Sequence, residues 1–167
     1  MSYYILLRGS LGIGKSTISR ELAKRLNAEY ISIDFVLEKY GLDKVDPDAE
    51  CIPAQNFNKA IGKILPEIKE KLANGKIAIF DACFYHKETI EYIIKNLVYP
   101  HYIFTLKAPL DVCIERDSKR KKSHGKDAAG AVHYLVSKFD YGTIIDVSKK
   151  NIEQTIHEIL SYLPKLK

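Results

Sequence analysis

The feature that most constrains the fold is a glycine-rich segment near the amino terminus, Gly9–Ser16, which reads GSLGIGKS. It matches the pattern GxxxxGKS/T. The short apolar run Tyr3–Leu7 precedes it, and apolar residues at helical spacing follow it. A strand, a tight glycine turn and a helix in this order direct backbone N–H groups and the positive end of the helix dipole into one small volume. The sequence therefore predicts a phosphate-binding turn between a strand and a helix.

Each part of this turn has an expected role in binding a nucleotide. The Lys15 ammonium would reach the β- and γ-phosphates of ATP, and the Ser16 hydroxyl would be a ligand of Mg²⁺. Backbone N–H groups would supply most of the other donors. The residues that we expect to contact the nucleotide are Gly9, Ser10, Leu11, Gly12, Ile13, Gly14, Lys15, Ser16 and Thr17.

Strand-like and helix-like segments alternate along the whole chain. After the first strand, four short segments rich in apolar and β-branched residues are separated by stretches with apolar residues at helical spacing. This alternation predicts an α/β fold in which a parallel sheet is covered by helices on both faces. The four further strands are expected at Tyr30–Ile33, Ile77–Phe80, Tyr102–Leu106 and Thr143–Val147.

Three segments depart from this regular alternation. Residues 41–53 are polar and irregular. Pro66 interrupts a helical stripe that runs from Phe57 to Leu72, so we expect a kink or a new helix start there. Ser118–Gly130 shows no apolar periodicity, and we expect it to be a loop or a mobile lid.

Length and composition fit a single domain over residues 1–167. Apolar residues make up 46% of the chain and charged residues 28%, which are ordinary values for a globular protein. No apolar run approaches the roughly 20 residues that cross a bilayer, and no signal peptide is evident, so we expect a cytoplasmic protein. Cys51, Cys83 and Cys113 are widely spaced, which predicts neither a disulfide nor a metal site.

The positive charge of the chain is concentrated in one place. The formal net charge is +5, and the segment Lys119–Lys126 alone contains five lysines and arginines. The rest of the chain is balanced between acids and bases. Such a basic segment is either a solvated loop or an anion-binding element.

Two other classes of phosphate-binding protein are disfavoured. A guanine-specific GTPase would need an Asn/Thr-Lys-x-Asp motif, and the sequence contains none. A large ATPase motor would need a longer chain. Small kinases remain as the class that fits both the length and the motif.

The chain resembles the nucleoside-monophosphate-kinase-like superfamily of P-loop kinases. Its small-molecule members include shikimate, gluconate and adenylylsulfate kinases and chloramphenicol phosphotransferase. The resemblance spans nearly the whole chain as topology. In sequence it rests on the phosphate loop, on Asp34 and Asp81 after the second and third strands, and on Cys113–Asp117 leading into the basic segment. It implies a three-layer sandwich with a five-stranded parallel sheet in the order 2-3-1-4-5 and a lid.

The resemblance also implies roles for four side chains outside the phosphate loop. In similar kinases, an acid at the position of Asp34 contacts the acceptor hydroxyl, often as a general base. Asp81 has the usual placement of a carboxylate that holds Mg²⁺ directly or through water. These two roles could be exchanged, and either residue could instead cap a helix or a turn. Arg116 and Arg120 are four residues apart on a predicted helix and would stack on adenine or clamp the transferring phosphoryl group.

The resemblance therefore implies an ATP- and Mg²⁺-dependent enzyme that phosphorylates a hydroxyl group of a small molecule. The expected catalytic residues are Lys15, Asp34, Arg116 and Arg120, and the expected metal-associated residues are Ser16 and Asp81. The acceptor should contact residues 34–55, whose several acids disfavour a highly anionic acceptor, and Tyr85 is a candidate for lining its pocket.

Two alternatives and the oligomeric state stay open. The basic segment would suit a polynucleotide 5′-hydroxyl kinase, although no basic stripe interleaved with aromatic residues is evident elsewhere. A nucleotide-binding regulator without catalysis is the second alternative, and the set of expected catalytic residues argues against it. Either a monomer or a homodimer is compatible with the sequence.

Overall fold

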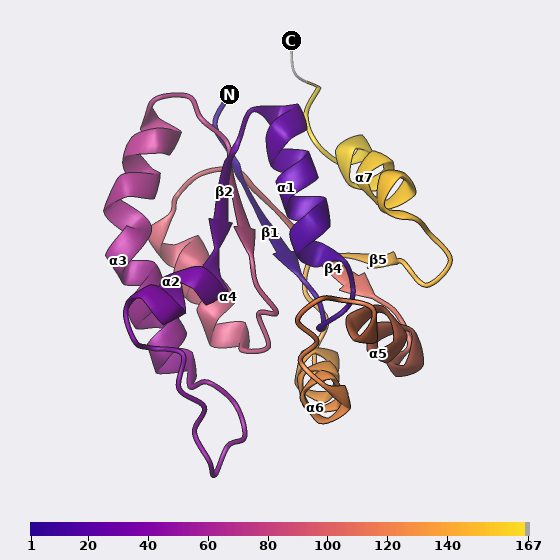
Figure 1. The fold of residues 1–167 in the computed structure, drawn as a ribbon. Coiled ribbons are helices and arrows are strands. Elements are labelled where there is room, and N and C mark those ends of the chain that lie inside the picture. Colours follow the sequence, from indigo (N-terminus) through magenta and orange to yellow (C-terminus); the bar gives the residue numbers. More distant parts are fainter. Residues whose placement is uncertain (166–167) are drawn as a thin grey trace.

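The computed structural model describes residues 1–165 and contains one sheet flanked by helices (Figure 1). Within these residues, no helix combines the length and apolar character needed to cross a membrane. The strands are β1 (Tyr4–Arg8), β2 (Glu29–Ser32), β3 (Ala78–Asp81), β4 (His101–Lys107) and β5 (Thr143–Asp146). The helices are α1 (Lys15–Leu26), α2 (Ile33–Lys39), α3 (Ala54–Ala73), α4 (Lys87–Asn96), α5 (Leu110–Ser118), α6 (Lys126–Ser137) and α7 (Ile152–Ser161).

The five strands form a parallel sheet in the order β2-β3-β1-β4-β5. All five strand predictions are confirmed to within one residue at each end. The predicted fold class and strand order are confirmed as well. Every crossover between neighbouring strands contains at least one helix, as parallel pairing requires.

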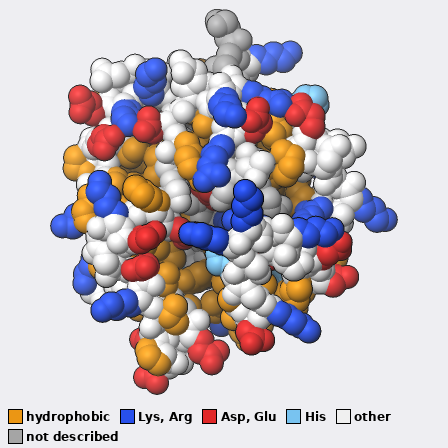
Figure 2. All heavy atoms as spheres, in the orientation of Figure 1, with side chains coloured by type: hydrophobic (Ala, Val, Ile, Leu, Met, Phe, Trp, Pro, Cys, Tyr) orange, Lys and Arg blue, Asp and Glu red, His pale blue; other side chains and the backbone are white. Residues whose placement is uncertain are grey.

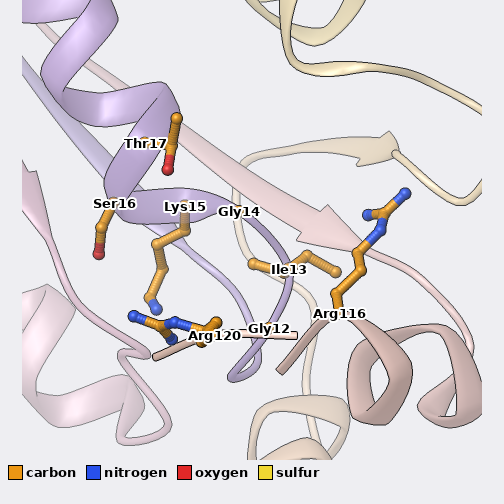
Figure 3. Close-up of a pocket in the computed structure, with 8 residues that line it drawn as sticks. All are labelled: Gly12, Ile13, Gly14, Lys15, Ser16, Thr17, Arg116 and Arg120. Carbon is orange, nitrogen blue, oxygen red and sulfur yellow. The ribbon is translucent and has the colours of Figure 1, made fainter. Parts of the chain in front are cut away.

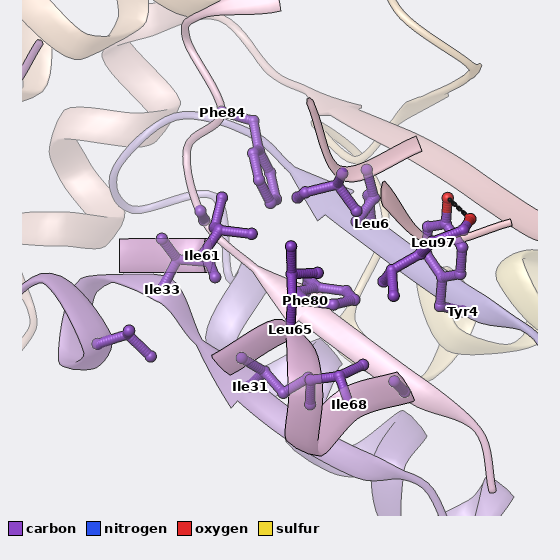
Figure 4. Packing of buried hydrophobic residues seen from close by; sticks show 14 of the residues in the cluster. Tyr4, Leu6, Ile31, Ile33, Ile61, Leu65, Ile68, Phe80, Phe84 and Leu97 are labelled. Carbon is purple, nitrogen blue, oxygen red and sulfur yellow. Dashed lines mark hydrogen bonds between the residues drawn. The ribbon is translucent and has the colours of Figure 1, made fainter. Parts of the chain in front are cut away.

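Side chains of the central strand alternate between two apolar layers, one on each face of the sheet. Tyr4 and Leu6 pack in the layer formed with α2, α3 and α4, part of which Figure 4 shows. Ile5 and Leu7 pack in the opposite layer, formed mainly with α1 and α7. All four side chains are fully buried, and burial of one such side chain typically contributes about 1.5–3 kcal/mol. The sheet therefore provides a rigid base for the loops at its carboxyl edge.

The carboxyl ends of β1, β2 and β3 lie level with one another. Leu7 of β1 and Ser32 of β2 both pair with Asp81 of β3. The glycine-rich loop follows β1, and Asp34 comes two residues after the end of β2. The register therefore brings three segments that are far apart in sequence to one edge of the sheet, where open parallel sheets bind ligands.

Helix α3 continues through Pro66 as one helix, so the predicted new helix start is wrong. Pro66 has no N–H group and cannot bond to the carbonyl group of Gly62, one turn earlier. Buried side chains on both sides of the proline, Ile61 and Ile68 among them, hold the two halves against the same apolar layer. Packing therefore offsets the loss of one helical hydrogen bond.

The basic segment is a shorter loop than the sequence predicts. Helix α5 continues through Ser118 and α6 begins at Lys126, so only residues 119–125 connect them. The predicted loop through Gly130 is wrong for its last five residues. The first half of α6 carries mainly alanine and glycine, which give a weak periodic signal, but Ala129 is fully buried against neighbouring elements. Tertiary packing decides the structure of this segment.

Arg8, the last residue of β1, is fully buried. Its guanidinium donates hydrogen bonds to the carbonyl oxygens of Phe84, Val136 and Phe139 and to the hydroxyl of Thr105, at 3.1–3.3 Å. It also lies over the Phe139 ring, 4.3 Å from the ring centroid. Burial lowers the pKa of Arg8 to about 10, which leaves it protonated at neutral pH. One buried cation thus joins the strand before the phosphate loop to the carboxyl end of α6.

Candidate active site

The glycine-rich loop has a conformation that only glycine tolerates well at two positions. Gly12 and Gly14 have φ values of 77° and 92°, in the left-handed region. A β-carbon on Gly12 would also overlap the carbonyl oxygen of Cys113. Helix α1 begins directly at Lys15, so the unpaired N–H groups of its first turn face the loop. The predicted phosphate-binding turn between a strand and a helix is therefore present.

A cavity of about 200 Å³ lies over this loop, and Figure 3 shows its lining. Arg120 extends toward the side of the loop that carries Lys15, whereas Arg116 lies at the other side, toward β5. The Nη2 group of Arg116 donates a hydrogen bond of 3.1 Å to the carbonyl oxygen of Val147. The cavity is lined by Gly12, Ile13, Gly14, Lys15, Ser16, Thr17, Arg116 and Arg120.

The sequence predicts that Arg116 and Arg120 lie on one helix, and this prediction is wrong. Helix α5 ends at Ser118, so Arg120 belongs to the connecting loop. Its backbone N–H bonds to the carbonyl oxygen of Asp117 in a turn. The turn and the helix place the two guanidinium groups on different sides of the phosphate loop, although both line the same cavity.

Lys15 is buried, with 7% of its surface exposed, and lies among acidic groups. Burial alone would lower the pKa of Lys15, but interactions with Cys83, Asp81 and Asp34 outweigh it, and the pKa is raised. Burial raises the pKa of the Cys83 thiol, so this side chain is neutral at neutral pH and accepts a hydrogen bond from Lys15 without a full charge. The two carboxylates are therefore the anions that hold the Lys15 ammonium in its charged form.

Asp81 is buried at the end of β3 and uses only one of its oxygens within the described residues. Its Oδ2 accepts a hydrogen bond of 2.7 Å from the Tyr30 hydroxyl, while Oδ1 is buried without a partner. The Tyr30 hydroxyl also interacts with Ser16, and burial followed by the bond to Asp81 raises the pKa of Tyr30 to about 12. An unpaired carboxylate oxygen close to a hydroxyl group suits Mg²⁺, which prefers oxygen ligands and retains several waters. These residues therefore fit a magnesium ion.

Asp34 lies in the first turn of α2 and lines a second, larger cavity. Ser32, not Asp34, caps this helix, because the Ser32 hydroxyl accepts the N–H group of Phe35. The capping alternative for Asp34 is therefore wrong. Protein atoms around the carboxylate limit its hydration and raise the pKa of Asp34, although Lys15 opposes the shift. Asp34 keeps contact with solvent through the open cavity.

This larger cavity has a volume of about 450 Å³ and lies between α2, residues 43–52, the segment after β3 and α6. Tyr85, which the sequence suggested as a candidate for the acceptor pocket, lines this cavity. Its wall is fixed where Ile52 donates its N–H to the Tyr85 hydroxyl at 3.1 Å and offers its carbonyl oxygen to the His86 ring at 2.7 Å. Figure 2 shows acidic and apolar side chains on this part of the surface, with lysine or arginine and histidine side chains beside them.

Asp117 connects the two cavities through the basic loop. Its carboxylate is 2% exposed and accepts hydrogen bonds from the hydroxyl of Ser123 and from the backbone N–H and Nδ1 of His124, at 2.8–3.0 Å. Arg120 lies 3.7 Å from the same carboxylate. Burial alone would raise the pKa of Asp117, but the hydrogen bonds from His124 and Ser123 lower it. Arg120 lines the phosphate cavity and His124 lines the larger one, so one acid organises residues of both.

Sequence reasoning missed several of these residues. Arg8 had a visible signal, because it is a charged residue at the end of an otherwise apolar strand. Asp117 appeared only as part of a resemblance, and no expected site residue in the sequence pointed to His124. No sequence signal points to Cys83, because its contact with Lys15 depends on the pairing of β1 with β3.

Comparisons with known proteins agree with this geometry. A family model described as an AAA domain matches residues 5–135. Shikimate kinase from Azobacteroides pseudotrichonymphae is 30% identical over 114 residues, which cover 67% of this chain and 64% of that protein. Shikimate kinase from Francisella tularensis subsp. novicida is 28% identical over 165 residues, which cover 94% of this chain and 90% of that protein.

A solved structure of a sugar kinase from a Janibacter species is similar in fold. Its TM-score is 0.74 with 15% identity, covering 97% of this chain and 94% of that one. This likeness concerns the fold alone. The family match spans both the phosphate loop and the basic loop, and so includes the motifs on which the resemblance rests. The chain therefore belongs to the AAA domain family, and its resemblance to P-loop kinases of the nucleoside-monophosphate-kinase-like superfamily is confirmed.

Proposed function

We propose that the protein transfers the γ-phosphoryl group of Mg·ATP to a hydroxyl group of a small molecule bound in the larger cavity. The observation that carries this proposal is the position of Lys15. Its ammonium lies in the wall of the phosphate cavity and interacts with Asp34, which lines the larger cavity. The proposed donor site and the proposed acceptor site thus adjoin where Lys15 interacts electrostatically with Asp34, and direct transfer requires such proximity.

Each residue has a defined task in this proposal. Backbone N–H groups of the loop and Lys15 hold the phosphates, and Arg120 stabilises charge on the transferring group. Ser16 and Asp81 would hold Mg²⁺, whose charge offsets that of the β- and γ-phosphates. Asp34 orients the acceptor hydroxyl and can accept its proton, which leaves Asp81 with the metal-associated role.

Adenine would lie beside Arg116. A cavity of about 320 Å³ adjoins the phosphate loop there, between Ile13, Val147 and Ile152. The bond from Arg116 to the Val147 carbonyl oxygen fixes the guanidinium at the edge of this cavity, where its plane can stack on a base. The basic loop, residues 119–125, would act as the lid that excludes water during transfer. An ATP-consuming enzyme of this kind fits the cytoplasm, and that location stays a prediction.

The test combines nucleotide binding with turnover. Mg·ATP at about 100 times its Kd should stabilise the fold by about 2.7 kcal/mol, or roughly 5–11 °C in Tm for a chain of this size. ATP consumption should then depend on an added acceptor alcohol. No thermal shift with any nucleoside triphosphate would end the proposal, and binding without turnover on any acceptor would favour a regulator.

The basic loop supports polynucleotide 5′-hydroxyl phosphorylation as a second candidate. Turnover on a short oligonucleotide would then fall steeply between low and moderate salt, because phosphate contacts release counterions. Turnover on a small alcohol should change little over the same range. The acidic lining of the larger cavity favours the small-molecule candidate.

A further inference from the structure

The larger cavity has a lining of unusual charge. Its charged members are all acids: Asp34, Glu38, Asp43 and Glu50. Within residues 1–165, no lysine or arginine lines it, and none of these four carboxylates forms an ion pair. His124 is the one basic side chain in the lining, and Asp117 already binds its ring.

Positive groups near the cavity do not neutralise the four carboxylates of its lining. Lys15 interacts with Asp34 but faces the phosphate loop. Lys138 acts electrostatically on Cys51 from outside the lining. A bound nucleotide would add several negative charges next to Lys15, so that lysine would not be free to neutralise an anionic acceptor as well.

The rest of the lining is apolar. Leu37, Ile52, Phe57, Tyr85, Val132 and Leu135 supply most of the wall. The rings of Phe57 and Tyr85 pack edge to face with centroids 5.5 Å apart, and the Tyr85 hydroxyl is already occupied by the N–H group of Ile52. A volume of about 450 Å³ is in the range of about 300–1,000 Å³ that usually holds an organic ligand.

These observations define a class of acceptor. Resting on the kinase function proposed above, we propose that the acceptor is an amphipathic alcohol that carries a protonated amine, and that alcohols bearing a carboxylate or phosphate are rejected. The apolar wall binds the body of the molecule, Asp34 meets its hydroxyl, and Glu38, Asp43 and Glu50 attract the ammonium group. An anionic acceptor would meet four like charges without a cation to offset them, and like-charge juxtaposition strongly disfavours binding.

Three alcohols with one carbon framework test this inference: phenylalaninol carries an amine, N-acetylphenylalaninol is neutral, and phenyllactate carries a carboxylate. Calorimetric binding to the protein with Mg·ADP should rank them in that order. Phenylalaninol should bind on the order of 100-fold more tightly than phenyllactate. The preference should shrink as salt rises, because these acids are exposed to solvent.

Variants that change the charge of individual acids test which residues cause the preference for the amine. The double variant Glu38→Gln, Asp43→Asn should lose most of the preference, and Glu38→Lys should shift it toward phenyllactate. Asp48→Asn is the matched control, because Asp48 lies in the same segment but does not line the cavity. Mg·ATP binding should be unchanged in all of these variants, since the phosphate cavity is separate.

The outcomes separate this inference from the proposed function. A preference for phenyllactate or the neutral alcohol, no binding of any of the three at millimolar concentration, or phosphorylation of the carboxylate shikimate would overturn the acceptor class alone. In each of those cases a nucleotide-induced thermal shift would leave the kinase proposal standing. Absence of that thermal shift would remove the kinase proposal first.

Discussion

The phosphate cavity and the larger cavity differ in both charge and origin. The first is built from two segments, the glycine-rich loop and residues 116–120, and its charged side chains are all cations. The second is assembled from several segments between Leu11 and Leu135, and among residues 1–165 no lysine or arginine joins the carboxylates of its lining. They adjoin where Lys15 interacts electrostatically with Asp34. The difference indicates that the proposed nucleotide site is fixed by a local motif, whereas the proposed acceptor site depends on the tertiary fold.

The largest effect on turnover should come from removing the positive charge of Lys15, which lies between the two cavities. Lys15→Met keeps the apolar stem of the side chain but removes the charge from the β- and γ-phosphates. We expect turnover to fall about 10³- to 10⁵-fold, while the apo protein stays folded. Steady-state kinetics and thermal unfolding measure the two effects.

Lys24→Met is the control, because Lys24 is an exposed lysine on the same helix. It should be close to wild type. Normal turnover in Lys15→Met would show that this loop is not the phosphate site, and the contrast between the two cavities would then lose its basis.

Substitution of Asp34 should have the next largest effect, and it should lower phosphoryl transfer without changing nucleotide binding. Asp34→Asn is nearly isosteric and should lower phosphoryl transfer about 10²- to 10⁴-fold if the carboxylate is a general base. Mg·ATP affinity should change little. Because the pKa of Asp34 is raised, its ionised fraction grows with pH through that raised value, so wild-type kcat should rise over the same interval.

The pH–rate profile is the decisive measurement, since the Asn variant should lack this rising limb. Asp111→Asn is a matched control, because Asp111 is an exposed acid in the first turn of α5. A loss much smaller than 10²-fold would indicate that Asp34 orients the hydroxyl more than it removes a proton. Unchanged transfer would assign the acceptor role to Asp81.

The two arginines should separate transfer from nucleotide binding. Arg120→Ala should lower kcat about 10²-fold, because this group lies toward Lys15 over the phosphate loop, where the proposed transfer would take place. Arg116→Ala should mainly weaken ATP binding, by about tenfold, because Arg116 lies on the β5 side. Lys121→Ala, in the same loop but outside the lining, should have little effect. Equal losses in all three variants would favour a diffuse basic surface and the nucleic-acid candidate.

The smallest effect on turnover should come from substituting Asp117, which binds residues that line both cavities. Asp117→Asn replaces an acceptor of three hydrogen bonds with a group that can also donate, so the basic loop should loosen. We expect trypsin to cut residues 119–125 about tenfold faster, with a smaller loss of turnover. Glu115→Gln, on the exposed side of the same helix, is the control.

The stability that Asp117 contributes should also depend on pH. Its folded pKa is lowered, so this contribution is present above the ordinary value of about 3.9 and is lost as pH falls through the folded value. Chemical unfolding at several pH values should show a smaller acid-dependent loss in Asp117→Asn. An identical pH dependence would mean that Asp117 does not hold the loop.

Much of the fold could be predicted from the sequence because its signals are local. The strands are short apolar runs, and the glycine-rich loop carries its own geometry in Gly12 and Gly14. Helix α6 could not be predicted, because alanines with little periodic signal become helical only through packing. The loop position of Arg120 was also not predictable. The sequence predicts that one helix carries both Arg116 and Arg120, but α5 ends at Ser118, two residues before Arg120.

The acceptor side was predictable only in outline. Placement of Asp34 and Asp81 at one sheet edge follows from the strand order, which the resemblance implied, and from the register, which it did not. The absence of lysine and arginine from the lining of the larger cavity, among the described residues, depends on how α6 and residues 43–52 are placed around it. No local pattern in the chain contains that information.

Arg8 has a consequence for how the chain acquires its structure during synthesis. Its hydrogen-bond partners belong to residues 84, 105, 136 and 139, so β1 is made first but cannot be completed until α6 has emerged and docked. Before that point, a buried guanidinium would lack two of its four acceptors, the carbonyl oxygens of Val136 and Phe139, which is costly. A nascent chain that ends before α6 should therefore lack a native phosphate loop, and nucleotide binding should appear only once nearly the whole chain has folded as one cooperative unit.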